Sequence, residues 1–154
     1  MLILEHGYIM KLEDLEEYWS KDAKINDFDL DKESLKTPVL HGKYYGFYNA
    51  EKMRLSKLNI EVSHLKRIKW EYYTGKLCDE ELDVYGWEPF QIKLLKSDID
   101  MYLEGDADLN DLKVKISLQK QKCTFLEDII KFLNVRGFAI KNAIDWRKFT
   151  QGAP

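Results

Sequence analysis

Apolar residues recur at alternating intervals of three and four positions in two long stretches of the chain. This spacing places them on one stripe of a helix, so each stretch predicts a long amphipathic helix that packs against other helices. The first runs from about Leu40 to Tyr73 and the second from about Leu109 to Leu133. The stripe of the first consists of Tyr44, Tyr48, Glu51, Leu55, Leu58, Val62, Leu65, Lys69 and Tyr72.

Local signals set the expected ends of these helices. Thr74 and Gly75 predict a C-cap for the first, because glycine adopts the left-handed conformation without a steric penalty. Asp106 and Asp108 are both suited to cap the N-terminus of the second. Pro38 is expected to stop any helix that runs into it and to lie in the first turn of the next.

Shorter helices are expected towards both ends of the chain. Residues 10–20 place Leu12, Leu15 and Trp19 on one stripe, which predicts a short amphipathic helix. Near the other end, Gly137 is expected to break or cap the second long helix. A short final helix then follows, with Ile140, Ile144 and Trp146 as its apolar candidates.

Residues 76–108 are the least helical part of the sequence, since Gly86 and Pro89 exclude a continuous helix. Residues 91–95 and 98–103 fit either two short strands or one helical turn each. The predicted fold class is mainly α: two long amphipathic helices with heptad-like seams, short terminal helices, and a small β element between them as an open alternative.

The second long helix carries two apolar stripes rather than one. A single partner helix covers only one face, so this pattern predicts a multi-helix assembly, formed between subunits. The candidate oligomerisation residues are Leu112, Ile116, Leu126, Ile130 and Leu133. The neighbouring stripe consists of Val114, Leu118, Phe125, Ile129 and Phe132.

Charge is unevenly distributed along the 154 residues, whose formal net charge is −3. Residues 43–76 contain eight Lys or Arg against three Glu, a local charge of +5, which leaves −8 on the remainder. A basic stripe on an acidic body is the footprint of a protein that binds polyanions with one face.

Four cations and three large aromatic rings lie within residues 65–76. Cations neutralise phosphates and aromatic faces stack on unpaired bases, so the combination indicates a surface for single-stranded nucleic acid. The alternative is a solvated end of an amphipathic helix whose rings pack inward, and the residues alone do not decide between the two.

Signals for other classes of protein are weak. No glycine-rich phosphate loop is present, and no histidine stands in metal-ligand spacing, so we expect neither an enzyme nor a bound cofactor or metal. The pairs Asp98/Asp100 and Asp106/Asp108 leave a metal-dependent nuclease as a remote alternative. Cys78 and Cys123 are expected to be free thiols. No signal peptide or membrane-spanning segment is expected, which predicts residence in the cytoplasm.

Three segments, in the same order, resemble the UvsY family of recombination mediators from T4-like phages. Lys69-Trp70-Glu71-Tyr72-Tyr73-Thr74-Gly75 is similar to its basic-aromatic motif, and Arg136-Gly137-Phe138-Ala139-Ile140-Lys141 to its C-terminal end. Met10-Lys11-Leu12-Glu13-Asp14-Leu15-Glu16-Glu17 resembles its N-terminus, so residues 1–9 precede the matching part. The family pattern has an aliphatic residue at the position of Trp70. The resemblance therefore does not decide whether Trp70 stacks on bases or packs.

The resemblance implies a protein that binds single-stranded DNA and helps load a RecA-like recombinase onto strands covered by single-strand-binding protein. It would act in phage recombination, recombination-dependent replication and repair, in the cytoplasm of the infected host. It also implies a ring-like homo-oligomer of six or seven subunits. Residues 1–108 would bind DNA and residues 109–154 would oligomerise. The competing hypothesis is a helical scaffold or adaptor protein without a nucleic-acid role.

The DNA-binding candidates combine the motif positions with further cations from residues 54–76. By resemblance, Arg67 and Lys69 match the two cations of the motif, and Tyr72 and Tyr73 match its tyrosines. The full candidate set is Arg54, Lys57, Lys66, Arg67, Lys69, Tyr72, Tyr73 and Lys76.

Overall fold

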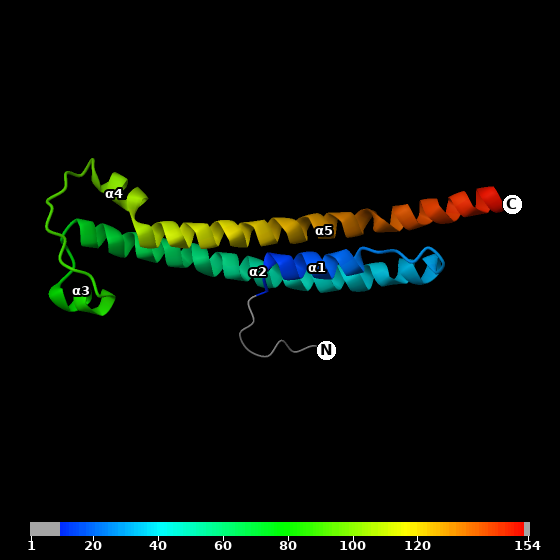
Figure 1. Ribbon diagram of the computed structural model, residues 1–154, viewed down its shortest axis with the longest axis horizontal. Coiled ribbons are helices and arrows are strands. Elements are labelled where there is room, and N and C mark those ends of the chain that lie inside the picture. The colour runs from blue at the N-terminus through cyan, green and yellow to red at the C-terminus, as the bar shows by residue number, and fades with distance from the viewer. Residues whose placement is uncertain (1–9, 153–154) are drawn as a thin grey trace. The chain divides into compact units, whose positions relative to one another are not determined.

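The computed structural model describes residues 10–152, which form helices and connecting segments without a strand (Figure 1). Their helices are α1 (Leu12–Asp22), α2 (Leu30–Tyr73), α3 (Asp79–Tyr85), α4 (Ile99–Gly105) and α5 (Ala107–Gln151). The mainly α fold class and the short helix near residue 10 are therefore confirmed. Residues 91–95 form an irregular segment and residues 99–103 belong to α4, so the β alternative is wrong for this region.

The two long helices each contribute to two compact units. One unit contains the described parts of residues 1–51 and 121–154, and the other contains residues 52–120. The division expected from the resemblance, with DNA binding before residue 109 and oligomerisation after it, is a division of function and stays a prediction. Residues 1–9 of its first part lie outside the described chain.

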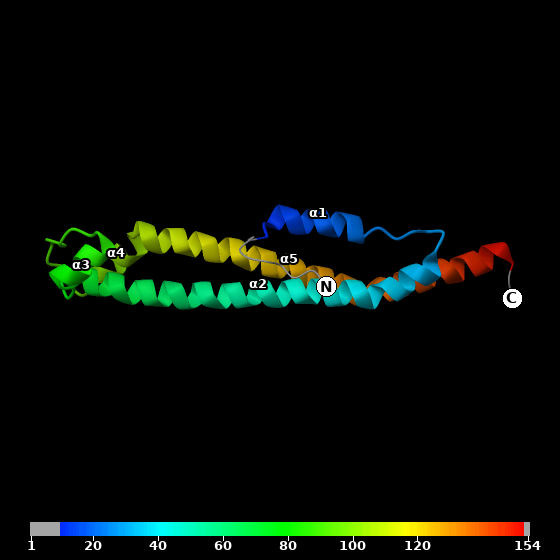
Figure 2. The same cartoon turned by 90° about the horizontal axis from the view of Figure 1, so that it is seen from below.

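In the first unit, α1 lies against α2 and α5 and closes a shared core (Figures 1 and 2). Leu15 of α1, Tyr44 of α2 and Leu126 of α5 are completely buried in this cluster. Trp19 packs edge-on against Tyr44, with ring centroids 5.3 Å apart. The stripe predicted for residues 10–20 thus faces the core, as its spacing requires.

In the second unit, α3 and α4 lie where α2 ends and α5 begins (Figure 1). Ile99 and Leu103 of α4 form a small core with Leu109 of α5, against which Leu65 of α2 packs. Gly75 ends α2 at a φ of +68°. The amide of Gly75 donates to the carbonyl of Tyr72 at 3.1 Å, which confirms the predicted C-cap.

Asp106 caps α5, because its Oδ1 accepts the backbone N–H of Leu109 at 3.0 Å. This confirms one of the two caps that the sequence offered. Leu109 itself is buried, so the cap fixes the helix start directly beside the core of the second unit.

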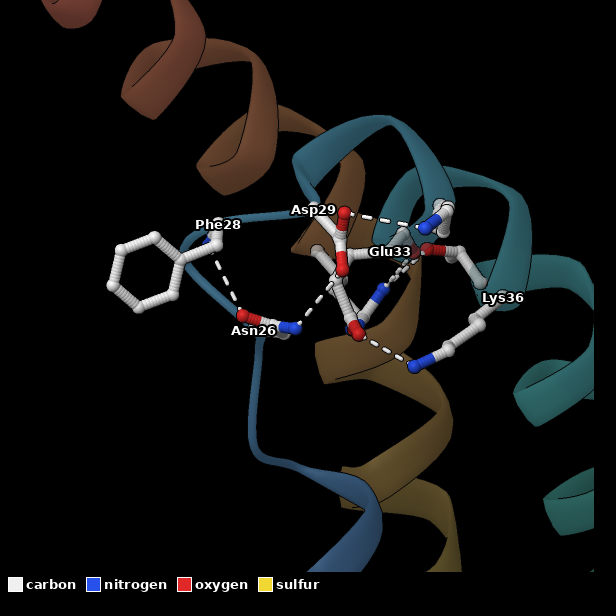
Figure 3. A network of polar contacts seen from close by, with 8 residues as sticks. Asn26, Phe28, Asp29, Glu33 and Lys36 are labelled. Atoms are coloured by element: carbon white, nitrogen blue, oxygen red, sulfur yellow. Dashed lines mark hydrogen bonds and ion pairs between the residues drawn. The ribbon is translucent and has the colours of Figure 1, made fainter.

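Pro38 lies inside α2, and the expectation that it would stop a helix is wrong. Proline removes one backbone hydrogen bond and strains the preceding turn. Here Arg136 of α5 supports that turn: Nη1 donates to the carbonyl of Glu33 at 2.6 Å and to Oγ1 of Thr37 at 2.8 Å. Glu33 also accepts from Lys36 (Figure 3). Tertiary contacts thus hold the helix where the local signal predicts an end.

Gly137 also lies inside a helix, and α5 continues to Gln151 without the predicted break or separate final helix. A glycine within a helix costs about 1 kcal/mol relative to alanine. Leu133, Arg136 and Ile140, at helical spacing around it, are all buried. Burial of an apolar side chain such as Leu133 or Ile140 contributes about 1.5–3 kcal/mol, and the two together outweigh the glycine. Trp146, an apolar candidate of the expected final helix, is exposed.

Candidate nucleic-acid interface

The exposed cations among the DNA-binding candidates lie along the second half of α2 and just beyond its end. Lys57, Lys66, Arg67 and Lys76 are exposed, and Arg54 is half-buried. Arg67 pairs with Glu71 one turn later, at 2.8 Å, on the helix surface. Such exposed pairs contribute little to stability, so the guanidinium is readily redirected to a phosphate.

Lys69 is placed differently from the other cations. It is only 5% exposed, and its Nζ lies 2.6 Å from Oδ2 of Asp108 and 3.0 Å from Oδ2 of Asp106. Burial lowers the pKa of Lys69, but the two carboxylates outweigh burial and raise it above its ordinary value. The ammonium also lies 4.1 Å from the ring centroid of Trp87. Lys69 therefore holds α2 to the start of α5, and the Asp106/Asp108 pair engages an ammonium group.

The two tyrosines of the motif point into an aromatic cluster. The hydroxyl of Tyr73 donates to Oδ2 of Asp106 at 2.7 Å, and that of Tyr72 donates to the carbonyl of Glu88 at 2.9 Å. Their rings pack against Phe90, with centroids 5.1 Å from Tyr73 and 5.6 Å from Tyr72. Burial and the adjacent Asp106 both raise the pKa of Tyr73. Both tyrosines therefore support the fold of the second unit.

Trp70 is the aromatic residue of the motif whose side chain remains accessible, with 39% of its surface exposed. Nζ of Lys76 lies 4.1 Å from its ring centroid, a cation–π contact. Beside Trp70 is a hollow of about 740 Å³, lined in part by Phe90, Lys93 and Lys96. Lys93 and Lys96 were absent from the predicted set, because they lie outside the +5 segment in a stretch without helical periodicity.

The carboxyl groups that hold these networks give a testable dependence of stability on pH. Burial raises the pKa of Asp106, but hydrogen bonds from Leu109, Tyr73 and Lys69 outweigh it and lower the pKa below its ordinary value. Lys36, together with Arg136, lowers the pKa of Glu33 despite burial. Each group contributes stability above its unfolded pKa of about 4, and this is lost as the pH falls through the folded value.

Urea midpoints measured between pH 7 and pH 2 are therefore expected to stay level down to about pH 4 and to fall below it. Asp106→Asn is the matched variant, because asparagine also caps helices but does not titrate. Its midpoint should fall less steeply in acid. A wild-type midpoint that stays level or rises below pH 4 would contradict this assignment.

Most of the candidate oligomerisation residues are buried within the fold of the single chain. Leu112, Ile116, Leu126 and Leu133 are buried, and Ile130 packs half-buried on the core of the first unit. Their role in a subunit interface stays a prediction. Other apolar side chains of α5 are exposed, including three that precede the C-terminal motif or belong to it: Phe132, Val135 and Phe138.

Two further features of residues 10–152 bear on other classes of site. None of their helices is long and apolar enough to cross a membrane. Within the same residues, His, Cys, Asp and Glu side chains nowhere gather in threes as a metal site would require.

Comparisons with known proteins place this arrangement among recombination proteins. The family model described as "Recombination, repair and ssDNA binding protein UvsY" matches residues 18–153. The recombination protein uvsY of Enterobacteria phage T4 is 28% identical over 145 residues, which cover 93% of this chain and 99% of that protein. A crystal structure of the bacteriophage T4 recombination mediator protein UvsY superimposes with a TM-score of 0.80 at 23% identity, covering 91% of this chain and 99% of that one. A second crystal form of the same protein also gives 0.80, over 93% of this chain. None of these descriptions names an enzymatic activity.

Proposed function

The chain belongs to the UvsY family of recombination, repair and single-stranded-DNA-binding proteins, and from this membership we propose how it acts. It binds single-stranded DNA through exposed cations near the end of α2. As a recombination mediator, it helps a RecA-like recombinase load onto strands covered by single-strand-binding protein. It does so without hydrolysing nucleotides itself, in the cytoplasm of a phage-infected bacterium.

The observation that carries the DNA-binding part is the exposure of Lys57, Lys66, Arg67 and Lys76 on a chain that is otherwise acidic. Side chains that pair with phosphates release the counterions condensed on the strand, and this release drives binding at low salt. The alternative of a solvated helix end whose rings pack inward also has exposed cations, and it accounts for the packing of Tyr72 and Tyr73. What supports DNA binding beyond it is the match of residues 18–153 to a family of single-stranded-DNA-binding proteins.

Assembly into a ring of six or seven copies supports such binding, because each copy offers only a few cations. Repeated sites on one strand raise the effective concentration of each further contact, so modest single-site binding becomes tight. This proposal places exposed apolar side chains of α5, such as Phe138, at the subunit interface. Most of the candidate oligomerisation residues are already buried within the chain.

The double variant Lys66→Ala, Arg67→Ala tests the DNA-binding proposal. Fluorescence anisotropy with an oligo-dT strand should show weaker binding, and the slope of log K against log salt should become shallower by about 1.4 per bound subunit, since each phosphate contact to a single strand contributes about 0.7. Light scattering should show an unchanged assembly, because both side chains are exposed.

A matched control removes the same charge from the other unit through Lys24→Ala and Lys148→Ala, two exposed lysines. Its affinity and salt slope should stay near wild type. Equal losses in both double variants would show that only net charge matters, and would remove the assignment of the site to α2. No binding by the wild-type protein at low salt would instead favour the scaffold hypothesis.

A further inference from the structure

The hollow beside Trp70 combines features that suit a nucleotide. Its volume of about 740 Å³ lies within the range of small-molecule sites. One part of its lining is aromatic and apolar, from Trp70, Phe90 and the buried Ile99. The other part is basic, from Lys76, Lys93 and Lys96.

The charges around the hollow favour an anion. Three lysines line it against one carboxylate, that of Asp100. Within residues 10–152, none of the three lysines forms an ion pair, and their side chains are exposed. The ammonium of Lys76 contacts the Trp70 ring. No protein carboxylate has to be displaced before these lysines meet a phosphate, so binding there avoids that cost.

Trp70 is also placed next to the exposed cations of α2. It follows Lys66 by four residues and Arg67 by three, and these spacings put side chains on adjoining parts of a helix surface. Lys66 lines a second hollow, of about 310 Å³, that shares Asp100 with the first. The basic surface of α2 therefore continues past Trp70 to the loop that carries Lys93 and Lys96.

We propose that Trp70 stacks on one base of the bound strand, and that Lys76, Lys93 and Lys96 contact the phosphates beside that base. The proposal rests on the proposed function and assigns the residue whose ring stacks on a base. Tyr72 and Tyr73 do not fill that role, because their half-buried rings pack against Phe90. Stacking on an indole accepts every base, so the site is tolerant of sequence. Lys93 and Lys96 extend the interface beyond the basic segment.

The test of stacking compares an oligo-dT strand with a strand of equal length in which all bases are replaced by abasic sites. Trp70→Leu should weaken binding to oligo-dT about tenfold per engaged subunit, the effect expected for loss of one stacked base. Its binding to the abasic strand should stay near that of the wild type. Trp70→Phe should retain most of the affinity for oligo-dT. Thermal unfolding followed by circular dichroism checks that both variants fold.

The test of the phosphate contacts uses surface variants that leave the packing intact. Lys93→Ala with Lys96→Ala should make the salt slope shallower by about 1.4 with both strands. Asp100→Asn should tighten binding, because it removes the one carboxylate of the hollow. The Lys24→Ala, Lys148→Ala variant again controls for net charge.

The outcomes separate this proposal from the function on which it rests. If wild-type protein binds oligo-dT and the Lys66→Ala, Arg67→Ala variant does so more weakly, the proposed function stands. The proposed stacking on Trp70 is then overturned if Trp70→Leu loses no affinity, or if it loses as much affinity for the abasic strand as for oligo-dT. The proposed phosphate contacts are overturned if Lys93→Ala with Lys96→Ala leaves the salt slope unchanged. Absence of wild-type binding overturns the proposed function itself.

Discussion

Replacing Arg136 by methionine is expected to lower the free energy of unfolding by about 4 kcal/mol, because it leaves a buried carboxylate without the buried cation that pairs with it. The guanidinium is 1% exposed and Glu33, its partner, is 2% exposed. Nη2 donates to Oε2 of Glu33 at 2.6 Å. Without Arg136 the Glu33 carboxylate keeps Lys36, whose own side chain is largely exposed, and a backbone hydrogen bond from Asn26. The backbone carbonyl of Glu33 also loses a donor.

Urea unfolding followed by circular dichroism, at one fixed protein concentration, measures this loss. The double variant Glu33→Leu, Arg136→Met should recover most of it, because removing both buried charges leaves neither unpaired. Arg147→Met is the control, since its pair with Asp27 is exposed and should contribute less than about 1 kcal/mol. A loss below 1 kcal/mol in Arg136→Met would show that the pair does not hold the helices together.

The buried position of Arg136 explains part of the motif that begins with this residue. Residues 136–141 were the C-terminal basis of the family resemblance, and within them Arg136 and Ile140 face the core while Phe138 is exposed. The motif therefore combines two helix-packing positions with one apolar surface position. Such a pattern identifies a relative without revealing which residues contact DNA.

The long helices were predictable because their signals are local and repeated. Apolar positions three and four apart persist over many turns, and Gly75 and Asp106 mark two of the ends through backbone conformation and capping, which are properties of a few consecutive residues. Pro38 and Gly137 gave the wrong ends for a related reason. A proline or glycine inside a helix has a local free-energy cost, but the contacts that offset this cost are tertiary. Around Pro38, for example, Arg136 contacts Glu33, which lies 103 positions away in the sequence.

The residue types of the candidate site were predictable from the sequence, but the roles of the individual residues were less so. The sequence identifies a basic and aromatic segment, but it does not tell which cations reach solvent. Lys66 and Lys69 are of one residue type three positions apart, yet only Lys69 meets Asp106 and Asp108, some 40 positions further along the chain. The aromatic side chains differ for the same reason: the Tyr73 hydroxyl donates to Asp106, whereas the Trp70 ring contacts the ammonium of Lys76.

Replacing Lys69 by methionine is expected to lower the free energy of unfolding by about 3 kcal/mol, towards the lower end of the range for a broken buried ion pair. The effect is moderated because Asp106 keeps two donors, the N–H of Leu109 and the hydroxyl of Tyr73. With the ammonium removed, the pKa of Asp106 should rise towards its unfolded value, so the variant should lose less of its remaining stability between pH 7 and pH 2 than the wild type does. Urea unfolding at pH 7 and pH 2 measures both effects.

The same variant decides between a structural role for Lys69 and the phosphate contact that the motif resemblance assigns to it. If Lys69 is structural, the folded Lys69→Met protein should bind oligo-dT with the salt slope of the wild type. A phosphate contact would make that slope shallower by about 0.7 and leave stability nearly unchanged. Lys66→Met, three positions earlier and exposed, should behave in the opposite way: stability within about 0.5 kcal/mol of wild type and a shallower salt slope. A crossed result, with Lys66 needed for stability and Lys69 for the slope, would refute the placement of both side chains.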